Sequence, residues 1–276
     1  MTGVLELDAN LSEGKTVREI LKEKHPEGAD AEFESLLRSD EGPTAPHPVI
    51  FDELTGPAIK AAALRTFGSA GPSGIDANGW KRLCSLFHGA SRSLCDALAA
   101  VARRLATSYV DPDGLAPLTA CRLCPLDKRP GVRPIGIAEV PRRIVGKAIM
   151  SVVRQDVVHA AGKFQLAARQ PAGCEVAVHA MRKLFEQAET DGVLLVDAKN
   201  AFNLLNRTTA MRNVHVLCPA IGPVTINTYR ASTELFVGGE TLLSREGTTQ
   251  GDPLAMAIYA VAIIPLIHQV STSDCT

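Results

Sequence analysis

The stretch Val193-Leu-Leu-Val-Asp-Ala-Lys-Asn-Ala-Phe202 joins an apolar run to a carboxylate and then to an aromatic ring. The apolar run predicts a buried strand over residues 193–196, with Asp197 at its end. A carboxylate in that place can bind a divalent metal ion, and the ring of Phe202 can form a wall beside it. A single Asp at such a point is more often a turn or helix-entry residue, so this interpretation depends on the rest of the chain.

A second block, Thr249-Gln-Gly-Asp-Pro-Leu254, begins about fifty residues later and opens another apolar segment. Its glycine lets the backbone approach a substrate closely. Asp252 invites assignment as a second metal ligand, but an Asp followed by a proline and an apolar run is typical of a helix start. The two blocks together favour nucleotide-polymerising chemistry, in which metal ions activate an attacking hydroxyl and steady the leaving group.

Charge is spread unevenly, although 29 Lys+Arg against 30 Asp+Glu give a net charge of −1. That total argues weakly against a dedicated nucleic-acid binder, which is usually basic. Residues 1–60 hold 6 basic and 13 acidic side chains, whereas residues 121–154 hold 8 basic and 2 acidic ones. The basic stretch predicts a local anion-binding surface, with a solvated helix face as the alternative.

The cysteine pattern and the apolar runs predict an intracellular protein, cytoplasmic or nuclear, that has no membrane span. Seven Cys and no apolar secretory segment at the start favour a reduced compartment. Cys121-Arg-Leu-Cys124 is a lone C-x-x-C pair, which is more typical of buried thiols than of a zinc site. The apolar run over residues 255–267 contains Pro265 and is too short to cross a bilayer.

Sequence patterning divides the chain into three parts. Residues 1–48 are predicted to be an acidic segment and linker, partly disordered, with one short helix over 16–24. Residues 49–190 are predicted to be a fingers-like helical region around a basic strand–turn–strand unit, with strands at 120–126 and 133–137. Residues 191–276 carry both blocks and a hairpin turn at Gly238-Gly239. Further helices are predicted over 58–67, 80–87, 91–108, 142–160, 173–188, 206–217 and 253–270.

The two blocks resemble motifs A and B of reverse transcriptases, the RNA-directed DNA polymerases. Asp197-Ala-Lys-Asn-Ala-Phe202 has the D-x-x-x-A-F form, and Gly247-Thr-Thr-Gln-Gly-Asp-Pro-Leu254 contains the Q-G-x-P-L core. Residues 125–137, with Lys128 and Arg-Pro-Ile135, and then 142–147 resemble the fingers block. Gly71-Pro-Ser-Gly-Ile-Asp76 resembles a turn of retrotransposon enzymes. The blocks keep the family's order over about residues 65–270, as in non-LTR-retrotransposon or group-II-intron-like enzymes.

The resemblance implies roles for three residues of the first block. Asp197 would be the catalytic motif A ligand of Mg²⁺, and the carbonyl of Ala198 would also face the metal. Phe202 would lie under the sugar and exclude a 2′-hydroxyl, which favours dNTPs over ribonucleotides. Plain core packing is the alternative for Phe202.

The resemblance also implies a nucleotide and nucleic-acid surface. Lys128 and Arg133 would grip the incoming triphosphate, and Gln250 with Gly251 would lie against the nucleotide and the template base. Phosphates of an RNA or DNA template–primer would be contacted by Arg142, Arg143 and Lys147. A solvated helix face explains those three equally well.

Motif C of the family, a hairpin with A-D-D or an aromatic-x-D-D, does not follow, and the sequence contains no Asp-Asp pair. The expected fold is α+β, the fingers and partial palm of a right-hand polymerase without the motif C hairpin and thumb. An unpaired sheet edge and an exposed apolar patch would result. The expected function is a truncated reverse transcriptase domain of a mobile element, a nucleotidyltransferase fragment inactive alone. A non-catalytic nucleic-acid- or protein-binding relic and an unrelated helical domain are the alternatives.

Overall fold

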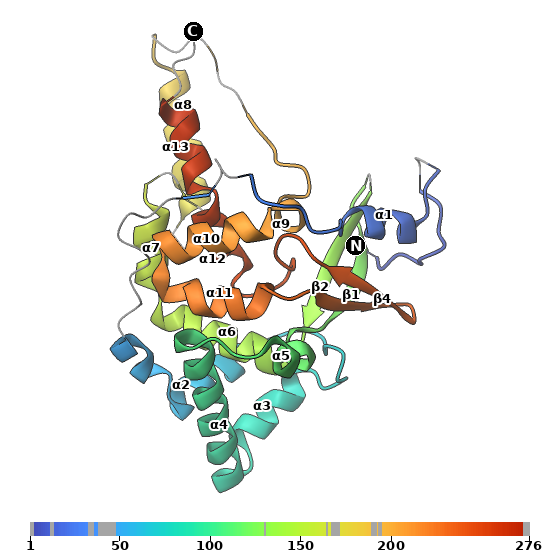
Figure 1. Cartoon of the computed structure of the whole chain (residues 1–276), viewed down its shortest axis with the longest axis vertical. Helices are drawn as coiled ribbons and strands as arrows, with labels where there is room; N and C mark the ends of the chain where they lie inside the picture. Colours follow the sequence, from blue (N-terminus) through green and yellow to red (C-terminus); the bar gives the residue numbers. More distant parts are fainter. Residues whose placement is uncertain are drawn as a thin grey trace.

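The computed structural model describes residues 3–11, 14–32, 36–37, 48–129, 131–163, 165–166, 172–188, 192 and 195–272. The described residues form one four-stranded mixed sheet with helices packed beside it, which confirms the expected α+β class. The sheet and helix α1 lie on one side of the molecule, and the longer helices lie below and beside them (Figure 1). The predicted linker over residues 40–47 lies outside the described residues.

Two hairpins supply the strands of the sheet. β1 (Cys121–Asp127) and β2 (Val132–Ala138) pair antiparallel across the basic turn. β3 (Thr233–Val237) and β4 (Glu240–Ser244) pair antiparallel across Gly238-Gly239, and both glycines have positive φ angles, of 53° and 82°. Glycine adopts that conformation without steric cost, so the turn closes between adjacent strands. Both predicted hairpins are confirmed.

A parallel pair of strands joins the two hairpins into one sheet. Cys121 of β1 lies opposite Leu235 of β3, and the strand order is β2-β1-β3-β4. Parallel strands require a long crossover connection between them. Here that connection carries helices α6 to α11, so the sheet connects parts of the chain that are distant in sequence.

The N-terminal segment packs against the sheet through α1 (Val17–Glu23). Thr16 and Glu19 form a capping box at the start of α1, as the predicted helix over 16–24 requires. Val17 and Leu21 are fully buried in an apolar cluster with Cys121, which is a buried thiol rather than an exposed metal ligand. This part of the N-terminal segment therefore belongs to the same core as the strands.

Helices make up most of the remaining structure. They are η2 (Pro48–Glu53), α2 (Gly56–Leu64), α3 (Ala77–Ser85), α4 (His88–Thr107), α5 (Pro112–Thr119), α6 (Val140–Val152), α7 (Arg154–Ala161), α8 (Gly173–Phe185), α9 (Ala201–Leu204), α10 (Arg207–Leu217), η3 (Pro219–Ile221), α11 (Gly222–Tyr229), α12 (Ala255–Ala262) and α13 (Ile264–Thr272).

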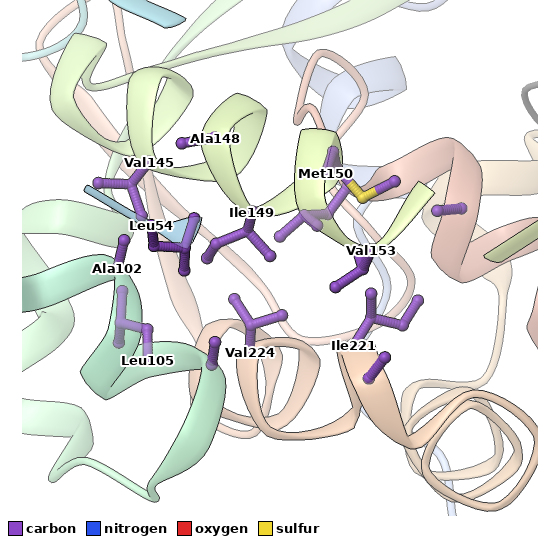
Figure 2. Packing of buried hydrophobic residues seen from close by; sticks show 14 of the residues in the cluster. Leu54, Ala102, Leu105, Val145, Ala148, Ile149, Met150, Val153, Ile221 and Val224 are labelled. Atoms are coloured by element: carbon purple, nitrogen blue, oxygen red, sulfur yellow. The ribbon is translucent and has the colours of Figure 1, made fainter. Parts of the chain in front are cut away.

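Helix α6 lies at the centre of the larger apolar core. Its Ile149 is fully buried, and Figure 2 shows it among Leu54, which follows η2, Leu105 of α4 and Val224 of α11. Val153, also fully buried, follows the last residue of α6, and α7 begins at Arg154. The predicted single helix over 142–160 is therefore two helices.

Two further sequence predictions need correction. The predicted helix over 253–270 is divided at Ile263 into α12 and α13. The predicted buried strand over 193–196 is wrong where it is described, because Leu195 and Val196 are 85% and 83% exposed and form no strand. A strand needs a neighbour for its backbone hydrogen bonds, and none of the four strands of the sheet pairs with residues 195–196.

Exposed apolar side chains concentrate on α8, on α13 and at residues 195–196. Helix α8 confirms the predicted helix over 173–188, yet its Val178 and Phe185 are 67% and 65% exposed. Val270 of α13 is 68% exposed. Both helices are drawn at the same end of the molecule (Figure 1). Amphipathic periodicity thus predicted the helix but not the exposure of its apolar face.

Candidate functional site

Two segments form the centre of the candidate site: residues 197–202, here the Asp197 block, and residues 247–254, the Gln250 block. Thr248 N donates to Phe202 O at 2.6 Å, and Gly247 N donates to Leu205 O at 2.8 Å. Gly247 has a φ of 61°, and a Cβ there would lie 2.0 Å from Phe202 O. Only glycine allows this approach, so the two blocks are joined directly through their backbones.

The Gln250 block also lies against β2. Gly136 N donates to Gln250 O at 2.9 Å. A Cβ on Gly136 would lie 2.2 Å from the Thr249 methyl carbon, and a Cβ on Gly251 would lie 2.7 Å from Gly136 O. The strand that carries Arg133 is therefore held against the block that carries Gln250. Arg133 itself is exposed on β2.

An aromatic pair lies beside these backbone contacts. The ring of Phe202 is 5.4 Å from that of Tyr259 on α12, with 50° between the planes. Burial raises the pKa of the Tyr259 phenol, and the negative charge of Asp197 raises it further. Phe202 and Tyr259 are therefore neighbours, and the charge of Asp197 acts on the Tyr259 phenol. Sequence reasoning missed Tyr259, because one aromatic on an apolar helix is too common a pattern to single out.

Asp197 is exposed and stands in an irregular segment rather than at a strand end. Mg²⁺ prefers oxygen ligands and commonly uses one or two carboxylates together with substrate phosphates. Across the part of the chain that the structure describes, no group of three or more His, Cys, Asp or Glu side chains could hold a metal ion. Asp197 and the exposed Ala198 therefore do not fit a preformed Mg²⁺ site.

The predicted template contact of Arg142 is corrected to an internal ion pair. Arg142 is only 7% exposed, and its guanidinium pairs with the carboxylate of Asp252. Tyr229 Oη donates to Asp252 Oδ2 at 2.6 Å, and Leu254 N donates to Asp252 Oδ1 at 2.8 Å. The predicted helix start at Asp252 and Pro253 is corrected, because α12 begins at Ala255 and its N-cap is Leu254, without a side-chain capping bond. The Asp252 carboxylate instead serves a buried network and the turn before α12.

The burial of this network changes the pKa values of Arg142 and Tyr229. Burial lowers the pKa of Arg142, but the charge and hydrogen bond of Asp252, together with Tyr229 and Cys121, raise the pKa above its ordinary value. Burial raises the pKa of Tyr229, and the Asp252 charge raises it further. Because these shifts keep Arg142 charged and Tyr229 protonated, the phenol remains a hydrogen-bond donor to the carboxylate.

The other predicted phosphate-binding residues remain accessible. Lys128 is exposed at the end of the β1–β2 hairpin, and Arg143 and Lys147 are half-buried on α6. Arg143 Nη1 donates to Phe67 O at 3.0 Å, and Lys147 Nζ donates to Arg65 O at 3.0 Å. These two side chains hold the loop after α2, and their contact with template phosphates stays a prediction.

Arg207 at the start of α10 is a buried residue that sequence reasoning missed. Its side-chain donors bond to the carbonyl oxygens of Gly247, Ala231, Ser244 and Glu246 and to the Ser244 hydroxyl. Burial lowers its pKa to about 10. Arg207 thus ties the end of β4 and the start of the Gln250 block to α10.

The end of α1 contacts the Asp197 block. Asn200 Nδ2 donates to Lys24 O at 3.2 Å, and Asn203 Nδ2 lies 3.0 Å from His25 Nε2. His25 Nδ1 lies 2.8 Å from Leu21 O. These partners require a neutral imidazole with its proton on Nδ1 and an acceptor at Nε2. Burial lowers the pKa of His25 in agreement with that form.

Acidification is expected to weaken the contact between His25 and Asn203. The folded-state pKa of His25 lies below its ordinary value of 6.5, so the unfolded chain binds more protons between the two values. The contribution of His25 to stability is therefore complete above pH 6.5 and is lost as pH falls through the lower, folded-state pKa. Urea unfolding of wild type and His25→Gln from pH 7.5 to 5 measures it. The wild type should lose more stability than the variant; equal slopes would refute the assignment.

Comparisons with known proteins add no relative to this geometry. No family model matches the chain, and no curated protein matches it. Among the described residues, no helix has both the length and the apolar character needed to cross a membrane. The joined Asp197 and Gln250 blocks are therefore the main basis for a functional proposal.

Proposed function

We propose that this chain is a reverse-transcriptase-like domain that binds a deoxynucleotide and a template–primer at the Asp197 and Gln250 blocks. The observation that carries the proposal is the hydrogen bond from Gly136 N to Gln250 O at 2.9 Å. It brings the segment expected to lie against the template base onto the strand expected to grip phosphates. A chance resemblance in an unrelated helical domain gives no reason for that contact.

The pairing of Phe202 with Tyr259 supports a deoxynucleotide rather than a ribonucleotide. Phe202 is half-buried and its backbone is bonded to the Gln250 block, so its ring can stand where a 2′-hydroxyl would otherwise fit. The 2′-hydroxyl is the group that distinguishes RNA from DNA building blocks. The ring of Tyr259, 5.4 Å away, fixes one side of Phe202 and limits the ways in which it can turn aside.

Binding without polymerisation is the activity that this donor set supports. Phosphoryl transfer by two metal ions needs several carboxylates around them, and Asp197 does not belong to a three-ligand group among the described residues. In primer-extension assays with Mg²⁺ and dNTPs, this chain is expected to give no product above the blank. Extension that disappears in Asp197→Ala would contradict this part of the proposal.

Sugar discrimination tests the pocket directly. The chain, with a template–primer bound, is titrated with the complementary dNTP and rNTP, and dissociation constants are measured by calorimetry. The wild type is expected to prefer the dNTP about tenfold, and Phe202→Ala should bring that ratio near one. Phe185→Ala, on the exposed face of α8, is the matched control and should keep the preference. A wild type that binds neither template–primer nor dNTP, or a Phe202→Ala variant with unchanged preference, would exclude the proposed pocket.

A protein-binding relic is the second candidate, and exposed apolar residues favour it. Val178 and Phe185 on α8 are 67% and 65% exposed, which is unusual for an amphipathic helix in a monomer. This candidate predicts no salt-dependent binding of nucleic acid. The titrations above therefore separate it from the proposed deoxynucleotide site.

A further inference from the structure

Three lysines from distant parts of the sequence stand on segments that the structure brings together near the Asp197 block. Lys24 ends α1, Lys128 follows β1, and Lys199 lies two residues after Asp197. The hydrogen bond from Asn200 Nδ2 to Lys24 O at 3.2 Å joins the first of these segments to the third. The blue chain that leaves α1 runs past α9, where the Asp197 block ends (Figure 1).

The second segment is held to the same N-terminal chain. Asp127 N, the residue before Lys128, donates to Gly3 O at 3.0 Å, and Leu5 N donates to Pro125 O at 2.9 Å. The N-terminal chain thus contacts β1 near Lys128 at one end and the Asp197 block at the other. Helix α1 lies between these contacts and is buried through Val17 and Leu21.

Three of the nearby carboxylates pair with other cations. Glu23 pairs with Lys15 at 2.6 Å and Asp127 with Arg129 at 3.0 Å. Glu27 pairs with Arg245, whereas Asp197 forms no ion pair among the described residues. Among the described residues, Lys24, Lys128 and Lys199 form no ion pair with a carboxylate.

The three lysines therefore carry positive charge that no ion pair with a carboxylate compensates. Burial lowers the pKa of Lys24, and repulsion from the ammonium groups of Lys128 and Lys199 lowers it further. Like charges close together are unfavourable unless an anion joins them. A single carboxylate would neutralise only one of the three, whereas a chain of phosphates carries several negative charges along its length.

We infer that Lys24 and Lys199, together with Lys128, bind the phosphate chain of a nucleotide, and that α1 therefore contributes directly to the site. The inference rests on the proposed function for the identity of the nucleotide, and it adds two residues that the motif resemblance does not assign. Lysine suits this role because its ammonium group is a compact point charge with three donors. The hydrogen bond from Asn200 to Lys24 O holds the backbone of Lys24, from which its side chain extends, beside the Asp197 block.

Inorganic tripolyphosphate tests the inference without a base, a sugar or a template. Its dissociation constant for the full chain is measured by calorimetry at low ionic strength, in the absence of added metal. Lys24→Gln and Lys199→Gln are each expected to weaken binding about fivefold, as the loss of one charge contact near a protein surface would. Lys24→Arg should retain binding. Lys22→Gln, an exposed lysine on the same helix, is the matched control and should change nothing.

Thermal unfolding of each variant accompanies these titrations, so that a misfolded variant is recognised. Tripolyphosphate that fails to bind the folded wild type, or that binds Lys24→Gln and Lys199→Gln as tightly as Lys22→Gln, overturns the inference. These outcomes do not depend on template–primer binding or sugar discrimination. The lysine site can therefore fail while the proposed function holds, and the reverse outcome is equally recognisable.

Discussion

Asp252→Ala is expected to lower the free energy of unfolding by about 3–5 kcal/mol, because it leaves the Arg142 guanidinium buried without its carboxylate. The side chain of Asp252 is 1% exposed, so water cannot take the place of the lost partner. The phenol of Tyr229 also loses its acceptor, which lies 2.6 Å away in the wild type. Urea unfolding followed by circular dichroism measures the change.

A double variant separates the ion pair from other consequences of the substitution. Arg142→Met combined with Asp252→Leu removes both charges, and apolar replacement of a buried pair is often neutral or stabilising. The double variant should therefore be more stable than Asp252→Ala. A loss below about 1 kcal/mol in Asp252→Ala would mean that the pair is solvated rather than buried.

Arg207→Met is expected to destabilise the fold by about 4 kcal/mol or more, because several buried carbonyl groups lose their donor at once. The guanidinium donates to Gly247, Ser244 and Glu246 at 2.9 to 3.1 Å. Methionine fills a similar volume but donates nothing. Arg207→Lys should also be strongly destabilising, because an ammonium cannot reproduce a planar fork of donors.

The matched control for Arg207 is an arginine on the surface. Arg182 on α8 is 77% exposed and pairs with Glu186 one turn later. Such exposed pairs contribute little to stability, so Arg182→Met should leave the unfolding midpoint almost unchanged. Equal effects of the two substitutions would show that the donors of Arg207 are replaced by water.

The sequence predicted the helices and strands whose formation depends on contacts between residues close together in the chain. The β3–β4 hairpin follows from Gly238-Gly239, whose positive φ angles close the turn. The helix over 206–217 follows from Asn206, whose side chain accepts from Thr209 N as an N-cap. The helix expected over 80–87 begins three residues earlier, at Ala77, because the side chain of Asp76 caps it by accepting from Gly79 N. In each case the decisive contact spans three residues or fewer.

Contacts between distant residues could not be predicted in the same way. Arg142 was expected on a template-facing surface, but its partner Asp252 lies 110 positions further on. The strand over 193–196 was expected because its residues are apolar, yet Leu195 and Val196 have no paired strand beside them. Whether a side chain is buried is decided by the rest of the fold, which local periodicity does not encode.

The sequence likewise predicted some residues of the candidate site and missed others. Asp197, Phe202 and Gln250 were selected from their blocks, and the bond from Thr248 N to Phe202 O brings those blocks together. Tyr259, Lys24 and Arg207 were not selected, because each joins the site through a contact with a distant segment. The type of residue alone does not predict such a contact.

The parallel pairing of β1 with β3 has a consequence for the order of folding. A chain emerging from the ribosome can form the β1–β2 hairpin and the Val4–Leu126 bridge early, but Cys121 and Arg122 at the start of β1 have no second neighbour until residues 233–237 have been made. Such non-local pairing folds slowly, and the waiting edge of β1 can meanwhile pair with another chain. Slower translation between the two hairpins should therefore increase the yield of insoluble protein, whereas co-expressed chaperones should reduce it.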